Sequence, residues 1–207
     1  LDPLKLVITN WEEAFGSATH LEPCTAPVHP HLPDLGKRQF NIGKEVWIER
    51  SDYEEVPSKG FLRLFPGNKV RLKYGYVIEV EGADYAPDAT SDAIKSGAAR
   101  AIVIRARVLK DTKSGTPGSD AAKVKGVVTW VAVEGAVQAE VRLYDRLFKD
   151  EHPDAGGKDF LAALNPDSLR VITAYVEPSL GAGGAIAAQA DDKFQFERHG
   201  YFVADRK

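Results

Sequence analysis

Short runs of β-branched and aromatic residues recur along this chain, and they limit the fold more than any other feature. Six runs stand out: Val46–Arg50, Gly75–Val80, Ala101–Val108, Gly126–Val131, Ala139–Tyr144 and Arg170–Val176. Val, Ile, Thr and aromatic side chains suit a pleated, half-buried surface. Many short strands at fairly regular spacing are typical of barrels rather than of a parallel α/β sheet. We therefore expect an all-β fold.

Helical patterns are few and short. Lys158–Leu164 could form two turns that end at Asn165, because the following proline disfavours the helical conformation there. Asp52–Glu55 could start another turn. Ala83–Ala99 and Lys110–Gly118 are rich in small and polar residues, and such segments bury too little apolar surface to offset an ordering cost of roughly 1–2 kcal/mol per residue. We expect both to be surface loops.

The composition narrows the class of protein and its compartment. The formal net charge is −3, which argues against a protein that coats nucleic acid with its whole surface but leaves room for one basic groove. No stretch reaches about 18 consecutive apolar residues, so we expect no membrane span. A single cysteine, Cys24, excludes an internal disulfide and fits a cytoplasmic location. Leu1–Lys5 lacks a signal-peptide pattern. The chain contains no Met, so we expect either a piece of a longer protein or a protein ordered only from Leu1.

A basic segment, Lys59–Lys73, is the first candidate binding surface. It contains five cations and no acid: Lys59, Arg63, Lys69, Arg71 and Lys73. Residues two apart in a strand share a face, so the last three cations project together while Val70 and Leu72 turn inward. Cations attract phosphates, Arg can bind a guanine edge, and the interleaved phenylalanines could stack on unpaired bases. Considered alone, a charge run of this kind is more often a solvated strand face.

A second candidate lies near the end of the chain, at Phe194–Phe202. Phe194 and Phe196 alternate as in a strand anchored in a core, and Gln195 faces the other way, where its amide could read a base edge or bind backbone. Strict alternation places Arg198 on the Phe side, so it reaches solvent only if the strand bends or ends nearby. A final barrel strand with no binding role explains the same pattern.

Residue types that could support catalysis or bind metal do not form a recognisable site. A loose group of possible zinc ligands comprises His20, Cys24, His29 and His31, but its spacing matches no usual finger. An acidic group comprises Asp145, Asp150, Glu151 and His152, and it lies in a polar, loop-like stretch. The chain also lacks a phosphate-binding loop, a nucleophile elbow and a His-Glu-x-x-His motif. We expect no catalytic residue, metal or cofactor within this chain.

Several segments in collinear order together resemble one family, the C-terminal anticodon-binding region of glutaminyl-tRNA synthetase, a class I aminoacyl-tRNA synthetase. The matching segments are Leu1–Ile8, His29-Pro30 with Leu35–Gln39, Glu45–Tyr53, Lys123–Val131, Val141–Phe148, Asn165–Leu169, Glu177–Leu180 and Phe194–Phe202. Glu45–Tyr53 resembles the family signature Trp-Ile-Asp/Glu-Arg-x-Asp-Phe/Tyr. The resemblance covers nearly the whole chain apart from Ala83–Lys110.

The resemblance implies an all-β fold of two six-stranded barrels of the ribosomal L25-like type with a few short helices. The barrel nearer the catalytic half would comprise residues 1–27 and 166–207, and the distal barrel residues 28–165. The resemblance also implies that the barrels read the glutamine anticodon, C/U-U-G, with its bases splayed into separate pockets.

Site residues carry over from the family by position. Arg71 and Lys73 fall where the first anticodon base is read, Arg63 where the third is read, and Gln195 and Arg198 at the middle base. The full candidate tRNA-binding set is His31, Lys59, Arg63, Arg71, Lys73, Gln195 and Arg198. Two members depart from the family: Lys73 replaces an Arg, which turns a bidentate fork into a point charge, and His31 replaces an Asn.

The class I catalytic signatures are absent from these residues. ATP with Mg, glutamine and the tRNA acceptor end would be bound by an N-terminal catalytic domain, so the parent protein would be an ATP-dependent glutamine–tRNA ligase. The implied partners are the tRNA(Gln) anticodon stem-loop and that catalytic domain, with neither DNA nor a membrane. Two alternatives stay open: the equivalent region of a glutamyl-tRNA synthetase, and a free-standing L25-like protein that binds structured RNA.

Overall fold

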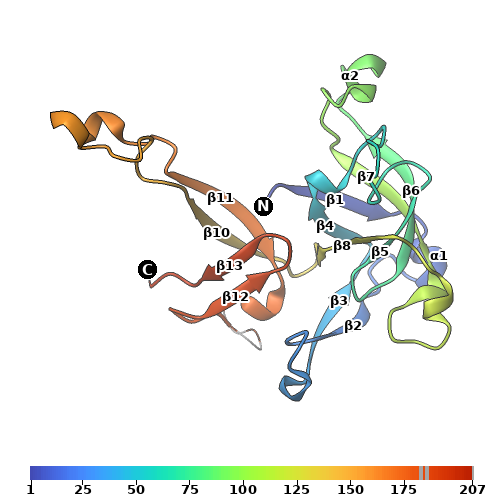
Figure 1. The fold of residues 1–207 in the computed structure, drawn as a ribbon. Coiled ribbons are helices and arrows are strands. Elements are labelled where there is room, and N and C mark those ends of the chain that lie inside the picture. The colour runs from blue at the N-terminus through green and yellow to red at the C-terminus, as the bar shows by residue number, and fades with distance from the viewer. Residues whose placement is uncertain (182–183, 185–186, 207) are drawn as a thin grey trace. The chain divides into compact units, whose positions relative to one another are not determined.

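One seven-stranded sheet organises most of the chain (Figure 1). The computed structural model describes residues 1–181, 184 and 187–206. The strands of the sheet, in chain order, are β1 (Pro3–Ile8), β4 (Glu45–Glu49), β5 (Lys69–Leu72), β6 (Val77–Asp84), β7 (Val103–Leu109), β8 (Gly126–Val128) and β9 (Trp130–Ala132). Their order across the sheet is β8-β5-β6-β7-β1-β4-β9.

The two edges of this sheet are consecutive in the chain, which nearly closes it into a barrel. Only Thr129 separates β8, which pairs in parallel with β5, from β9, which pairs antiparallel with β4. Counted as one broken strand, β8 and β9 make a sheet of six strands. An all-β barrel fold is confirmed.

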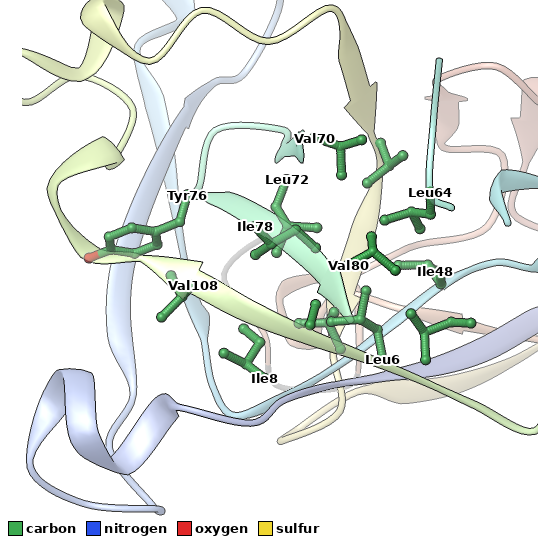
Figure 2. Close-up of a cluster of buried hydrophobic side chains, with 14 of the residues drawn as sticks. Leu6, Ile8, Ile48, Leu64, Val70, Leu72, Tyr76, Ile78, Val80 and Val108 are labelled. Atoms are coloured by element: carbon green, nitrogen blue, oxygen red, sulfur yellow. The ribbon is translucent and has the colours of Figure 1, made fainter. Parts of the chain in front are cut away.

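Alternating apolar residues fill the barrel. Leu4, Leu6 and Ile8 of β1 are buried while the residues between them are partly exposed, as a half-buried strand requires. Val70 and Leu72 are fully buried, so the predicted inward face of β5 is confirmed. Figure 2 shows side chains from the barrel strands converging in one apolar cluster.

The other strands form three two-stranded sheets. These are β2 (Glu22–Pro27) with β3 (Lys37–Ile42), β10 (Val137–Tyr144) with β11 (Leu169–Val176), and β12 (Lys193–Phe196) with β13 (Gly200–Val203). The chain divides into two compact units, one of residue 1 with residues 138–174 and the other of residues 2–137 with 175–207. A second closed barrel stays a prediction.

The position of β1 corrects one predicted boundary. β1 pairs antiparallel with β4 and in parallel with β7, so it belongs to the same barrel as the strands between residues 45 and 132. The prediction that placed residues 1–27 in a different barrel from residues 28–165 is therefore wrong for β1. Its alternation shows that a strand is buried on one side but not which sheet buries it. The remaining boundaries stay predictions.

The helices are short. They are α1 (Trp11–Phe15), α2 (Ser91–Lys95) and the 3-10 turns Pro33–Leu35, Arg50–Asp52, Lys110–Thr112, Ser119–Ala121, Ala155–Gly157, Phe160–Ala163 and Pro178–Leu180. A fold with few short helices is thus confirmed. The helix predicted at Lys158–Leu164 is a single 3-10 turn. No helix in the described part of the chain is long and apolar enough to cross a membrane.

The predicted loop Ala83–Ala99 contains the end of a strand and a short helix. β6 extends to Asp84, and α2 begins after Thr90, whose side chain accepts a hydrogen bond of 3.2 Å from the Ala93 amide. Such a cap satisfies one of the free amides of a helix N-terminus, and a single cap is a weaker sequence signal than an apolar stripe. The prediction of a loop throughout this segment was therefore wrong.

Candidate nucleic-acid interface

The backbone of the basic segment Lys59–Lys73 packs against the barrel. Leu64 is fully buried and bridges to Tyr53, and β5 then carries the chain into the sheet. The backbone of Leu62 packs directly on β8, where a Cβ built on Gly126 would lie 2.0 Å from the Leu62 carbonyl oxygen. Only glycine permits that approach. The basic side chains therefore project from a backbone that packing holds in place.

Lys69 is the most exposed cation of β5. Its ammonium lies 3.5 Å from the Glu79 carboxylate on the neighbouring strand, and half of its side-chain surface is accessible to solvent. An exposed pair of this kind contributes about 0–1 kcal/mol to stability. Lys69 therefore has the features of the solvated strand face considered above.

Arg71 lies on the same strand face but points its guanidinium into its own protein. Nη1 donates to the Thr112 carbonyl at 2.6 Å and to the Ser114 hydroxyl at 3.1 Å, and Nη2 donates to the Ser119 carbonyl at 3.0 Å. Longer contacts reach the Gly75 and Ala122 carbonyls. Arg71 therefore holds the 112–122 loop, which a strand pattern alone could not reveal.

Lys73, at the end of β5, faces the hairpin formed by β12 and β13. Its ammonium forms an ion pair with Glu197, in the turn of that hairpin, and lies 5.3 Å from the centre of the Tyr74 ring. About one third of the Lys73 side chain is exposed. An ammonium so placed keeps N–H donors for an anionic ligand, since it carries three of them.

Arg63 and Arg198 meet at one carboxylate, that of Asp52. Arg198 binds it in a bidentate manner, with Nη1–Oδ2 and Nη2–Oδ1 distances of 2.8 and 2.6 Å. Arg63 Nε lies 3.0 Å from Oδ1 as an ion pair, although its N–H is not aligned as a hydrogen bond. The Asp52 side chain is fully buried. Hydrogen bonding to Asp52 raises the pKa of Arg198 above its usual value, so the guanidinium of Arg198 is charged.

The position of Arg198 departs from strict alternation because β12 ends at Phe196. Arg198 occupies the turn before β13 and has a φ of +71°, a left-handed conformation that costs a non-glycine residue about 1–2 kcal/mol. The strand thus ends before Arg198, as Arg198 requires in order to reach solvent. Its guanidinium also stays about one-third exposed.

The remaining candidates lie on exposed backbone. Gln195 is exposed on β12 and pairs with Tyr201 of β13, which is also highly exposed. Lys59 is exposed in the turn before Phe61. His31 lies in the connection between β2 and β3, where its amide donates to His29 Nδ1 at 3.1 Å. The structure thus gathers Arg63, Lys73 and Arg198 together with their acidic partners, whereas His31 lies on the connection between β2 and β3.

Asp52 is the residue that sequence reasoning missed. It falls within the signature segment Glu45–Tyr53, but there it counted only as part of a match. Its partner Arg198 is 146 residues away in the chain, so no local pattern indicates the pair. An acidic residue in a strand-end turn is usually a solvated surface group, and only its burial shows otherwise.

The possible zinc ligands are dispersed among other roles. Cys24 is buried in the barrel core, and burial raises its pKa to about 11. His20 pairs with Glu22 at 2.9 Å, and His29 contacts His31 ring to ring. Among the described residues, no group of three or more His, Cys, Asp or Glu could hold a metal ion.

An all-β barrel that gathers arginine and lysine side chains beside partly buried aromatic residues defines a candidate single-stranded RNA reader. Family models give the finer class. Two models described as tRNA synthetases class I (E and Q), anti-codon binding domain, match residues 1–96 and 127–205. The chain belongs to this family of anticodon-binding domains.

Three similar proteins carry the same name. The chain is 59% identical over 206 residues to glutamine–tRNA ligase of Cupriavidus taiwanensis and 58% identical over 206 residues to that of Cupriavidus necator. It is 49% identical over 207 residues to glutamine–tRNA ligase of Bordetella avium. In each comparison the match covers 100% of this chain and 32% of the relative. The chain thus spans about a third of the length of the curated relatives it matches.

Proposed function

We propose that this chain is the anticodon-binding domain of a glutamine–tRNA ligase and that it recognises the anticodon stem-loop of tRNA(Gln). The observation that carries the proposal is the convergence of Arg63 and Arg198 on buried Asp52, with Lys73 paired to the residue that precedes Arg198. Bases of a splayed loop are read by donors on their edges and by aromatic stacking. Partly buried Phe61, which lies under the Arg63 guanidinium, and exposed Tyr201, which pairs with Gln195, offer aromatic surface.

Each candidate has a proposed base. Arg63 reads the third base, Gln195 and Arg198 the middle base, and Lys73 the first base. Arg71 serves the first-base site by holding the 112–122 loop, because its shortest hydrogen bonds all go to that loop. Lys59 and His31 are proposed as phosphate or sugar contacts, since both are exposed on turns.

The proposal extends to the whole protein. In the relatives, the remaining two thirds of the length would supply ATP and Mg binding, the glutamine site and the contact with the tRNA acceptor end. This chain would supply recognition and no catalytic residue. We propose a cytoplasmic location, where the tRNA substrate would be found.

One alternative has a specific observation in its favour. The family description covers both E and Q synthetases, so the chain could read a glutamate anticodon. The three relatives described above are all glutamine–tRNA ligases, which favours glutamine. Charging assays with the full-length protein, supplied in turn with glutamine and with glutamate, separate the two.

Footprinting tests the recognition role. The full-length protein is mixed with tRNA(Gln), and the accessibility of each nucleotide to a chemical probe is measured with and without protein. We expect protection of all three anticodon bases, and weaker protection of the third base in the Arg63→Ala protein. An anticodon loop that stays as accessible as in free tRNA would contradict the proposed function.

A further inference from the structure

The turn between β12 and β13 is held on the barrel by three successive residues. Glu197 pairs with Lys73, Arg198 with Asp52, and His199 Nε2 lies 3.3 Å from Glu49. The barrel partners come from the end of β5, the Arg50–Asp52 turn and the end of β4. Of the three barrel residues, Asp52 alone is fully buried.

The burial of Asp52 makes its contacts with arginine obligatory. A buried carboxylate without a partner is strongly unfavourable, whereas one that accepts hydrogen bonds from charged donors is satisfied. Arg198 reaches it from the C-terminal hairpin and Arg63 from the basic segment. Two hydrogen bonds therefore hold Arg198, and an ion pair holds Arg63, beside Asp52 before any ligand binds.

The same geometry leaves donors for a ligand. An arginine carries five N–H groups, and Arg198 uses one from each terminal nitrogen on Asp52. Arg63 Nη2 donates to the Ser51 carbonyl at 3.3 Å, and its side chain remains 38% exposed. The exposed fraction of the Arg198 side chain is 36%. Two N–H groups of Arg198 are thus directed at Asp52, and Arg63 is held beside the same carboxylate, while more than a third of each side chain stays exposed.

Sharing one carboxylate also connects the two arginines. Both use Oδ1 of Asp52, so displacement of either guanidinium changes the position and charge balance experienced by the other. Arg198 additionally holds a left-handed backbone conformation, which persists only where surrounding contacts fix it. Loss of Asp52 would free the Arg198 side chain, while Glu197 and His199 would still hold the turn through Lys73 and Glu49.

We propose that Asp52 is a positioning residue that sets Arg63 and Arg198 as one unit, so that recognition of the middle and third anticodon bases depends on it jointly. This inference rests on the proposed function and assigns a role to a residue that cannot itself contact RNA, because its side chain is fully buried. The first base, which we assign to Lys73 and the loop held by Arg71, does not depend on Asp52.

The test measures base discrimination in the full-length protein. Affinities are determined for an anticodon stem-loop of tRNA(Gln) and for three stem-loops, each changed at one anticodon base. In the Asp52→Asn protein we expect discrimination at the middle and third positions to fall by about tenfold each, which is within the range of a bidentate base contact. Discrimination at the first position should stay within about twofold of wild type, an outcome that general unfolding would not give.

A matched control removes a comparable ion pair that faces solvent. Asp84→Asn breaks the pair with Arg105 on β6 and β7, where both side chains are about half exposed. This variant should retain wild-type discrimination at all three positions. If Asp52→Asn does not fold, as judged by circular dichroism, Asp52→Glu keeps the charge and displaces the carboxylate by one methylene, and the same loss at two positions is expected.

The outcomes separate the two proposals. Unchanged discrimination in a folded Asp52 variant would overturn the positioning role, and so would an equal loss at all three positions. A wild-type protein that binds all four stem-loops equally would instead overturn the proposed function, and this inference with it.

Discussion

Replacing Arg71 by Ala tests whether this residue is a structural clamp rather than a free base reader. The change removes the three shortest hydrogen bonds from the guanidinium, to the Thr112 and Ser119 carbonyls and the Ser114 hydroxyl. Thr112 and Ser119 are buried, at 7% and 5% exposure, so water replaces these donors poorly. A hydrogen bond to a charged group contributes about 1.5–3 kcal/mol, and three at the lower end give about 4.5 kcal/mol.

The assay is native-state hydrogen exchange of the amides between residues 110 and 122 in the full-length protein. Exchange measured at individual amides does not require a global free energy of unfolding, which is poorly defined for a multidomain protein. A loss of about 4.5 kcal/mol accelerates exchange limited by local opening by about two-thousandfold. Arg71→Lys should give a smaller acceleration, because one ammonium cannot span the same acceptors.

Lys69→Ala is the matched control, since Lys69 shares the strand and face of Arg71 and forms an exposed ion pair with Glu79 at 3.5 Å. We expect a change in exchange of less than about fivefold. Equal exchange in the Arg71→Ala and Lys69→Ala proteins would refute the clamp, and Arg71 would then be free to reach the first anticodon base.

Three further predictions follow from single residues. Cys24 is buried and its pKa is raised to about 11, so about one thiol in a thousand is ionised at pH 8. Cys24 should therefore resist iodoacetamide in the folded protein and react only on unfolding. Rapid labelling of the native protein would contradict this prediction. Gly126→Ala places a Cβ 2.0 Å from the Leu62 carbonyl oxygen. We therefore expect the local stability of β5 and β8, measured by hydrogen exchange, to fall by about 3 kcal/mol or more. Unaltered exchange would be inconsistent with the packing. Gln195→Ala should weaken the preference for U at the middle anticodon position by about fivefold or more in stem-loop binding, and an unchanged preference would remove Gln195 from the middle-base site.

The barrel could be predicted because its signal is local. Alternation in β1 and β5 follows from burial on one face, and the short β-branched runs made strands the best choice at most positions. Assignment of β1 to a barrel could not be predicted, because its neighbours are β4 and β7, about 40 and 100 residues further along the chain. Alternation specifies a buried face but carries no information about the partner strand.

The candidate site was predictable in its charges but not in their organisation. Residue type indicated Arg63, Arg71 and Arg198, and the family resemblance assigned them to bases. The structure shows that Arg71 is engaged by a loop and that the other two share Asp52. These arrangements depend on contacts that span from 11 to 146 residues, and such contacts leave no periodic trace in a sequence.

The most direct test of the recognition role is the affinity of the full-length wild-type protein for four anticodon stem-loops measured under one salt condition. One stem-loop carries C-U-G and each of the others changes a single anticodon base. We predict that every change weakens binding by about tenfold or more. Equal affinities for all four would show that the cations around Asp52 and Lys73 contact the RNA backbone only, and would contradict an anticodon-reading function.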